Sequence, residues 1–491
     1  MKEYICKEKM RDGKIRIKII GKIGRERVRA EHVGVAHNEE ELKMYLILAR
    51  ERLKDPRQSE LNLYGEASKE ELLITQNTAY SKYLYDKISE VYDKLKFNEI
   101  GDEIFRDLTI ARIIEPGSKK DTIRVLSGLG LKAPTLKGIR CSLKRTQKEE
   151  YRGKLSKKCC EFIGLREGML LLYDVTTLYF EIDKEDGYRK RGYSKERRLE
   201  PQIVIGLLVD KNGFPLAINS FEGNKAETKT LSPVLKAFKR EKGIKEITVV
   251  ADAGMLSADN LEMLEEEGFK FVVGSRRYKT PYEIAEYHYK GKETIKDKQT
   301  FDTMQKFGEN KTERRVIYQY RQERAKLDNS NTDKQLKKAQ EQKASNAKIK
   351  KAKFLKIINS KKEIDYEAVE AERQMAGIKG YVTNLTCDEQ TVIDAYHNLF
   401  EVEKSFRMTK SDLQVRPVFH QTRESIEAHL TICFAALAMS RYIQDKTKLS
   451  IKKFVQKLGP IKTGVIQIGD KEYTARPRID VEIEKIVNCL K

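Results

Sequence analysis

Cysteine is sparse in this chain of 491 residues, and long apolar runs are absent. The seven cysteines form no CxxC pair, which argues against a zinc module and indicates buried thiols in a reducing compartment. The longest apolar run, Leu430–Met439, is about half of the ~20 residues needed to cross a bilayer, and the N-terminus has no apolar signal core. We therefore expect a soluble, unexported, cytoplasmic protein with no membrane partner.

Several enzyme signatures are also missing. The chain has no GxxxxGK[ST], HExxH or GxSxG sequence, so it lacks the marks of nucleoside-triphosphate binding, of zinc hydrolases and of a serine nucleophile elbow. Its six histidines are scattered and form no spaced pair suited to a metal. We expect no nucleoside triphosphate among its ligands.

Positive charge is what the sequence has in excess. The difference between 97 Lys+Arg and 75 Asp+Glu gives a net charge of +22. Such a surplus binds phosphate polymers by neutralising their charge and releasing counterions, although a basic but inert surface is the alternative interpretation. At ~150 residues per domain, the length suggests about three domains.

The N-terminal third predicts two regions. Residues 1–60 form a basic β/α segment, in which Lys14–Ile20 alternates like a half-buried strand and a helix runs from about Asn38 to Leu53. In the region 61–165, apolar residues recur at spacings of three and four from about Thr75 to Lys144, which predicts short helices with tight breaks between them. This pattern suits a helical DNA-binding region of helix-turn-helix type, or a plain helical bundle.

Strand signals begin at Met169 and predict a mixed α/β domain. The predicted order is strand, strand, strand, helix, strand, helix, strand: Met169–Tyr173, Ile203–Val209, Phe214–Phe221, Thr228–Lys242, Ile247–Val250, Ser257–Glu267 and Phe271–Gly274. This is the order of a ribonuclease-H-like sheet, whereas a doubly wound fold needs a crossover helix between its first strands. We place this catalytic domain at residues 166–275 and 378–447.

The remaining segments are a Lys-rich insertion at 276–377 and a C-terminal helix and hairpin tail at 448–491. Between Lys334 and Lys356, nine lysines stand against one acid, Glu341. The insertion is either a solvated arm or a surface that follows phosphates, and the overall charge favours the second interpretation.

Two aspartates, Asp174 and Asp252, end the first and fourth predicted strands, which are neighbours in this topology. Carboxylates so close repel each other unless a cation lies between them, and Mg²⁺ prefers oxygen ligands. Each aspartate could also simply end a strand or cap a helix.

A predicted helix from Glu389 to Ser411 carries a third carboxylate. At ~100° per residue, Tyr396, Glu403, Arg407 and Lys410 fall within about 60° of one another, beside an apolar stripe. Glu403 and Arg407 could form only a surface ion pair. Together with two strand-end aspartates, however, Glu403 completes a set that can hold two Mg²⁺ ions ~4 Å apart for in-line phosphodiester displacement.

At these residues the sequence resembles the DDE transposases of bacterial and archaeal insertion sequences, in the branch marked by Tyr-(2)-Arg-(3)-Glu-(6)-Lys. The motif stands here as Tyr396, Leu399, Glu403 and Lys410. The segments YDVTTLYFE, EGNKAETKTL and VVADAGMLS are similar to other blocks of the family, and the resemblance covers about residues 100 to 447.

The resemblance implies Asp174, Asp252 and Glu403 as catalytic ligands of two Mg²⁺ ions, with Mn²⁺ as a substitute. The substrates it implies are double-stranded DNA with terminal inverted repeats and a target DNA. Water nicks the transposon end, and the freed 3′-hydroxyl then attacks. The resemblance also implies a homodimer or a higher synaptic assembly in the prokaryotic nucleoid.

Other implied roles concern DNA binding. By resemblance, Tyr396 and Lys410 contact backbone phosphates, and spacing adds Arg407. Lys225, in the GNKAETKT segment, either contacts DNA or lies in an ordinary loop before a helix. Leu399 stands where the family has arginine, and the chain has no tryptophan to stack on a flipped base. The sequence therefore does not decide between a hairpin and another excision intermediate. The alternatives are a catalytically inactive DNA-binding protein derived from a transposase, and a metal-dependent nuclease on the same fold.

Overall fold

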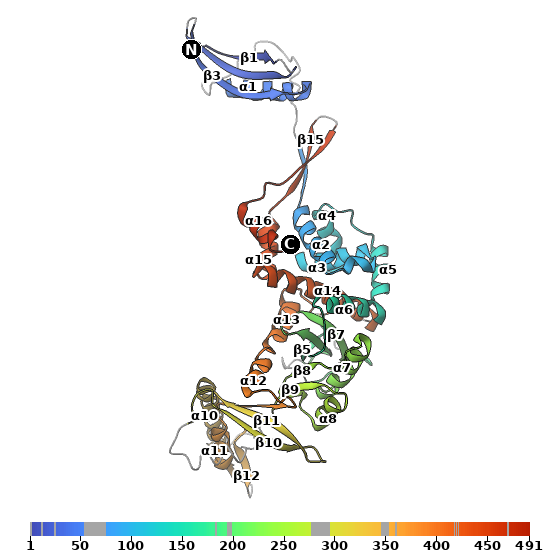
Figure 1. Ribbon diagram of the computed structural model, residues 1–491, viewed down its shortest axis with the longest axis vertical. Coiled ribbons are helices and arrows are strands. Elements are labelled where there is room, and N and C mark those ends of the chain that lie inside the picture. The colour runs from blue at the N-terminus through green and yellow to red at the C-terminus, as the bar shows by residue number, and fades with distance from the viewer. Residues whose placement is uncertain are drawn as a thin grey trace. The chain divides into compact units, whose positions relative to one another are not determined.

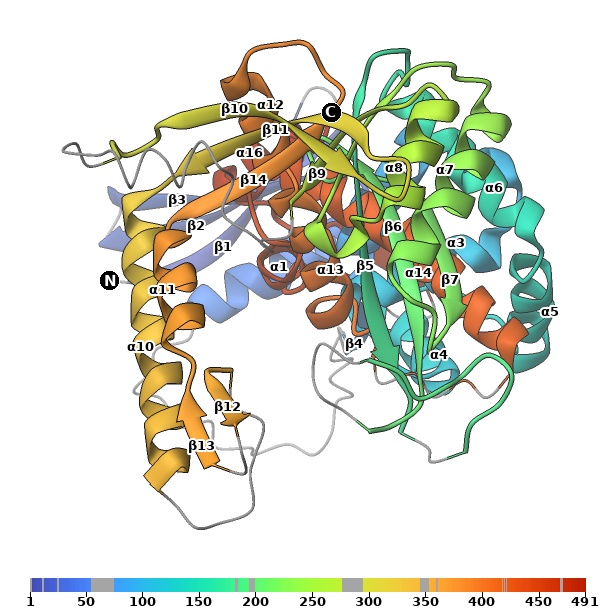
Figure 2. The same ribbon diagram turned by 90° about the horizontal axis from the view of Figure 1, so that it is seen from below.

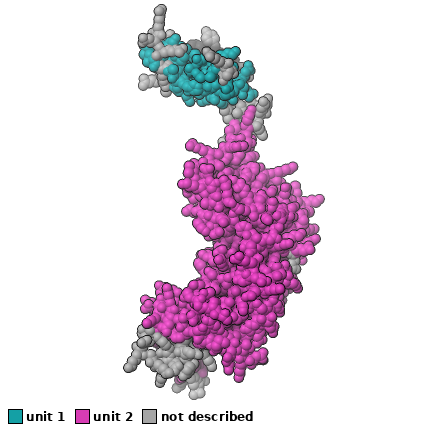
Figure 3. Space-filling model, in the orientation of Figure 1, with its two compact units in different colours: residues 1–73 teal, residues 74–491 magenta. Residues whose placement is uncertain are grey.

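The computed structural model describes residues 2–10, 13–23, 26–53, 75–181, 184–193, 199–275, 295–344, 353–358, 361–416, 418, 420, 422–468 and 471–491. Parts of each predicted region lie outside these ranges, and the longest such stretches are residues 54–74, 276–294 and 345–352. The chain divides into two compact units, Met1–Leu73 and Ile74–Lys491, and each is described by itself (Figure 3).

The first unit is a three-stranded antiparallel sheet with one helix against it. Its elements are β1 (Lys2–Lys9), β2 (Ile15–Ile23), β3 (Glu26–Ala36) and α1 (Glu39–Leu53). Alternate residues of β2, Ile17 and Ile19, are buried in one cluster with Ala49 of α1. The predicted strand and helix of this segment are both confirmed.

The second unit begins with short helices joined by tight breaks. They are α2 (Lys82–Lys94), the 3₁₀ helix η1 (Phe97–Ile100), α3 (Glu103–Ile114), α4 (Lys119–Gly128), α5 (Leu136–Thr146) and α6 (Glu149–Phe162). Polar N-caps explain several starts: Asp102 accepts from the Phe105 N–H, and Ser118 forms a capping box with Asp121. The predicted helices are present, while their reading of DNA remains a prediction.

A mixed sheet of eight strands forms the centre of this unit (Figure 1). The strands, in their order across the sheet, are β10 (Thr300–Phe307), β11 (Thr312–Tyr320), β14 (Ile378–Thr383), β9 (Lys270–Gly274), β8 (Thr248–Ala251), β5 (Leu170–Tyr179), β6 (Gln202–Asp210) and β7 (Pro215–Glu222). β5, β8 and β9 are parallel, and the other pairings are antiparallel. Two strands of the predicted insertion, β10 and β11, therefore extend the sheet beyond β14.

Helices cover both faces of the central strands (Figure 2). α7 (Thr228–Lys242) and α8 (Ala258–Glu266) lie on one face, and α12 (Glu389–His397), α13 (Phe400–Ser411) and α14 (Arg423–Thr447) lie on the other. Every residue of β6 is buried, as expected for a strand covered on both sides. α14 is buried from Ala428 to Ile443, which makes it the central helix of the core, as its apolar run predicted.

The rest of the unit consists of smaller elements. They are α10 (Gln322–Ala344), β12 (Leu355–Ile358), β13 (Lys361–Ile364) and α11 (Tyr366–Gln374), then α15 (Ile451–Leu458), β15 (Thr463–Ile468), β16 (Lys471–Ala475) and α16 (Val481–Asn488). The predicted tail hairpin is confirmed as β15 and β16, and β4 (Thr75–Tyr80) joins it as a third strand. Among the helices within the described ranges, none has both the length and the hydrophobicity needed to span a membrane.

Candidate active site

Asp174 lies inside β5, where that strand loses one of its two partners. β5 pairs in parallel with β8 only from Leu170 to Tyr173, but it pairs with β6 as far as Tyr179. The prediction that the strand ends at Asp174 is therefore wrong, because hydrogen bonding to β6 continues after β8 has ended. Asp174 is half-buried, and its Oδ1 accepts the Val175 N–H at 2.7 Å.

Asp252 directly follows β8 and is exposed. The register pairs Tyr173 with Ala251, so Asp174 and Asp252 are the next residues along two neighbouring strands. The two strands are hydrogen-bonded neighbours, and each aspartate is the first residue after their last pair. The predicted adjacency of the two strands is thus confirmed.

The predicted helix Glu389–Ser411 is two helices. α12 ends at His397 and α13 begins at Phe400. Between them the chain tightens, because the Leu399 N–H donates to the Tyr396 carbonyl and the Glu401 N–H to the Asn398 carbonyl. The break lets α12 cover β8, β9 and β14 while α13 covers β5 and β6, and Leu399 is buried at this corner.

Tyr396 consequently does not continue the predicted row of Glu403, Arg407 and Lys410. It is only 4% exposed, and its hydroxyl donates to Asp252 Oδ1 at 2.9 Å. Its ring packs on Tyr381 with centroids 4.9 Å apart, and Lys379 Nζ lies 4.2 Å from its centroid. Burial, followed by the charge of Asp252, raises the pKa of Tyr396 well above its usual range. The phenol therefore stays protonated and donates a hydrogen bond to Asp252. Its phosphate contact stays a prediction.

An open cleft of about 440 Å³ brings several of the predicted residues together. Asp174 lines it from β5, and Glu403, Arg407 and Lys410 line it from α13. Arg416 also lines it, with its guanidinium 5.7 Å from the Tyr179 ring. Arg416 was not among the predicted site residues, although it stands in the LQVRPVF stretch just after the Glu403 helix.

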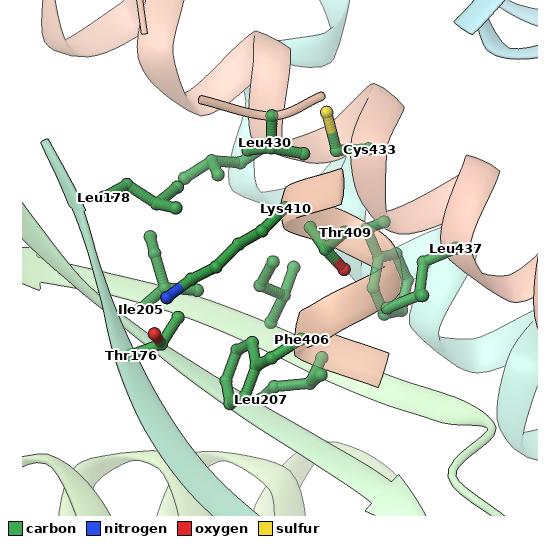
Figure 4. A pocket seen from close by; sticks show the side chains of 13 residues that line it. Thr176, Leu178, Ile205, Leu207, Phe406, Thr409, Lys410, Leu430, Cys433 and Leu437 are labelled. Atoms are coloured by element: carbon green, nitrogen blue, oxygen red, sulfur yellow. The ribbon is translucent and has the colours of Figure 1, made fainter. Parts of the chain in front are cut away.

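Lys410 reaches the cleft across an apolar cavity beneath α13 (Figure 4). Its stem lies among apolar side chains of β5, β6, α13 and α14, and its nitrogen points toward Thr176 of β5. This is the behaviour of a lysine that buries its methylenes and keeps its charge at a polar edge. Thr176 is two residues beyond Asp174 and therefore on the same face of the strand.

The segment before α7 lies beside the turn that follows β8. Lys225 lies half-buried in the turn between β7 and α7, where its N–H donates to the Glu222 carbonyl at 2.9 Å. Glu227 occupies the N-cap position of α7, but its side chain makes no capping hydrogen bond. It lies instead over Gly254, where a Cβ would stand 2.5 Å from Glu227 Oε2.

The carboxylates are suited to a hard cation by their chemistry, since Mg²⁺ takes oxygen ligands. Asp174 and Asp252 are neighbours in the sheet, and Asp174 shares the cleft with Glu403. Over the described residues, no three His, Cys, Asp or Glu side chains are close enough together to hold one ion.

A family model described as Transposase DDE domain matches residues 166–439, more than half of the chain. The chain belongs to this family, and it is a DNA transposase. Enzymes of this family generally use divalent metal ions.

Among solved structures, the chain is similar to a piggyBac transposase in a synaptic complex with hairpin DNA, determined by cryo-EM. The TM-score is 0.41 at 11% sequence identity, over 78% of this chain and 81% of that chain. No curated protein sequence matches the chain.

Proposed function

We propose that this transposase cleaves the phosphodiesters at the ends of its own element and transfers the freed 3′-hydroxyl into target DNA. The observation that carries the proposal is how two pairs of carboxylates are placed, with Asp174 common to both. The β5–β8 register sets Asp174 beside Asp252, and α13 brings Glu403 to the cleft that Asp174 lines. The strand order β7-β6-β5-β8-β9, with β6 antiparallel, supports a ribonuclease-H-like catalytic domain.

Asp174, Asp252 and Glu403 are the proposed ligands of two Mg²⁺ ions, which Mn²⁺ can replace. Bound there, the ions supply activation of the attacking oxygen and stabilisation of the leaving oxygen. The Tyr396 hydroxyl donates to one oxygen of Asp252, and the other oxygen would bind the cation. This bond fixes the rotamer of an exposed carboxylate, which lowers the entropy that it loses on binding.

The basic side chains of the cleft are the proposed DNA contacts. Arg407, Lys410 and Arg416 place three positive charges beside Asp174 and Glu403, where the phosphates that flank the reacting one would lie. In the first step a water oxygen bonds to phosphorus and the bond to the 3′-oxygen breaks. The released 3′-hydroxyl oxygen then bonds to the phosphorus of a target phosphodiester and loses its proton, while the target's bond from phosphorus to the 3′-oxygen breaks and leaves a new 3′-hydroxyl. The family resemblance supports a dimer or higher assembly that holds two DNA ends.

The test is cleavage and joining on labelled linear DNA that carries the element's own ends, in Mg²⁺. We expect Glu403→Gln to lose both products while still binding the ends. Glu266→Gln is the matched control, because Glu266 is an exposed glutamate of α8, on the opposite face of the sheet.

Three outcomes separate the candidate functions. Joined products that depend on the metal and on Glu403 support the transposase mechanism. Cutting without joining supports a metal-dependent nuclease. If the wild type binds the ends but does not cut in Mg²⁺ or Mn²⁺, the catalytic proposal fails and an inactive DNA-binding protein is the better description.

A further inference from the structure

A second basic pocket, of about 430 Å³, lies between the helical region and the segment that follows the Glu403 helix. Lys119 and Lys120 line it from the first turn of α4, and Arg140 lines it from α5. His420 closes it from the connection between α13 and α14. None of the side chains that line the pocket is acidic.

Lys119 carries a charge that its neighbour in the pocket does not balance. Its Nζ lies 2.8 Å from His420 Nε2. Burial and then Arg112 lower the pKa of Lys119 to about 8, while burial and then Lys119 lower the pKa of His420 to about 4. At neutral pH the lysine is therefore mostly charged and the imidazole is neutral. A neutral ring accepts a hydrogen bond but does not compensate a half-buried cation.

His420 is held in place from behind. Its ring packs on that of His429, with centroids 4.8 Å apart, and Cys433 Sγ lies 3.7 Å from His429 Nε2. His429 and Cys433 belong to the buried part of α14. The stack from α14 through His420 to Lys119 therefore gives the ammonium group a fixed position in the pocket.

The same connection links the pocket to the active-site cleft. Arg416 lines the cleft, and His420 lines the pocket. Between them the Val418 N–H donates to the carbonyl of Tyr179, at the end of the strand that carries Asp174. Four residues span at most ~14 Å. The Cα atoms of Arg416 and His420 are therefore at most ~14 Å apart, which is the rise of about four phosphates of one DNA strand at ~3.4 Å each.

We propose that this pocket binds one backbone phosphate of the DNA strand whose reacting bond lies in the cleft. The proposal rests on the proposed function, because it takes DNA as the ligand of that cleft. A phosphate supplies the negative charge that is missing from the lining of the pocket around Lys119. It also accepts charge-assisted hydrogen bonds from Lys119, Lys120 and Arg140. The pocket then fixes the register of the DNA, so that the correct phosphodiester faces Asp174 and Glu403.

The experiment measures binding of the full chain to end DNA in which single phosphates are replaced by uncharged methylphosphonates. The variants are Lys119→Gln and Arg140→Gln. Arg140 is exposed, so the second variant remains informative if the first is unstable. Lys157→Gln, at an exposed lysine of α6, is the matched control.

We expect each pocket variant to bind about tenfold more weakly and to lose ~0.9 from the salt slope, the value of one phosphate contact. In the wild type, one methylphosphonate a few nucleotides from the reacting bond should weaken binding about tenfold, as loss of a charged contact does. The same replacement should change binding by Lys119→Gln little. Lys157→Gln should keep the full wild-type response.

Additive effects at every phosphate near the reacting bond would overturn the proposal. A second pair of results would also overturn it. If inorganic phosphate at constant ionic strength stabilises the wild type but not Lys119→Gln, and no single methylphosphonate couples to that variant, the pocket holds a free anion and not a DNA phosphate. If Lys119→Gln and one methylphosphonate are coupled in their effects on binding but the protein does not cut DNA, the pocket proposal holds and the catalytic proposal fails. If the protein cuts DNA but shows no such coupling, only the pocket proposal fails. If the protein binds no DNA, both proposals fail.

Discussion

Removal of the Tyr396 hydroxyl tests how Asp252 is positioned. In Tyr396→Phe the ring keeps its packing on Tyr381 and under Lys379, while Asp252 Oδ1 loses a donor at 2.9 Å. A hydrogen bond to a charged group contributes ~1.5–3 kcal/mol. Asp252 is exposed, so water replaces much of this, and we expect a loss of unfolding free energy of ~1 kcal/mol or less.

The effect on catalysis should be larger than the effect on stability. A freely rotating Asp252 spends less time in the orientation that the reaction needs. A barrier increase of ~1.4 kcal/mol slows cleavage about tenfold. Single-turnover cleavage at saturating DNA measures this rate, and fluorescence anisotropy measures DNA affinity, which we expect to change less than about twofold. Tyr381→Phe is the control, because it removes a hydroxyl from the neighbouring ring and keeps the Tyr396–Asp252 bond.

The opposite pattern would refute this reasoning. If Tyr396→Phe binds DNA about tenfold more weakly and cleaves at the wild-type rate once saturated, the hydroxyl acts on a phosphate and not on Asp252. Equal losses in Tyr396→Phe and Tyr381→Phe would instead show that the paired rings matter only for packing.

Three further predictions follow from contacts elsewhere in this unit. Gly254→Ala places a methyl group 2.5 Å from Glu227 Oε2, two residues after Asp252, so we expect slower cleavage. The free energy of urea unfolding should fall by less than ~1 kcal/mol, because only the end of a flexible side chain must move. Glu427→Gln removes the charge that pairs with Arg152 at 2.6 Å, where both side chains are 17% exposed, and should cost about 3 kcal/mol on urea unfolding. His420 has a folded-state pKa of about 4, below its unfolded value, so the unfolded chain binds the proton first and stability should fall as the pH drops from about 6.5 to about 4.

Each of these has a result that contradicts it. Wild-type cleavage by Gly254→Ala would show that crowding between Glu227 and the turn after β8 does not disturb the reaction. An unchanged urea midpoint in Glu427→Gln would mean that Arg152 finds another partner. In thermal melts across the pH window, His420→Asn should flatten the acid loss, and an unaltered slope would assign that loss to other groups.

The position of the two aspartates could be predicted because it depends on local signals. Short apolar runs identify buried strands, and the order of strands and helices then restricts which strands are neighbours. Asp174 and Asp252 each follow such a run, so their adjacency follows from topology. The exact end of β5 could not be predicted, because it depends on how far β6 pairs, and that partner lies more than twenty residues further along the chain.

The break between α12 and α13 was missed for a related reason. Helical periodicity runs without a gap through Tyr396, Leu399 and Glu403, and no glycine or proline interrupts it. The break arises because different parts of the sheet must be covered, which is a tertiary requirement. It separates Tyr396 from the cleft and turns it toward Asp252, a residue 144 positions away.

Charge is the property for which the sequence misleads most, because a local count ignores partners that fold in from elsewhere. The stretch with nine lysines and one acid contains Lys353 and Lys356, yet these pair with Glu372 at 2.9 Å and Asp365 at 2.7 Å, from α11 and its N-cap. Lys119 lies in an ordinary stretch of sequence, but it faces a neutral imidazole 301 residues away. A cation stabilised by a carboxylate gives up that contact to bind DNA, whereas a half-buried cation without one gains its compensation from the phosphate. The lysine that binds most favourably is therefore set by its burial and its neighbours, and not by the density of positive charge around it in the sequence.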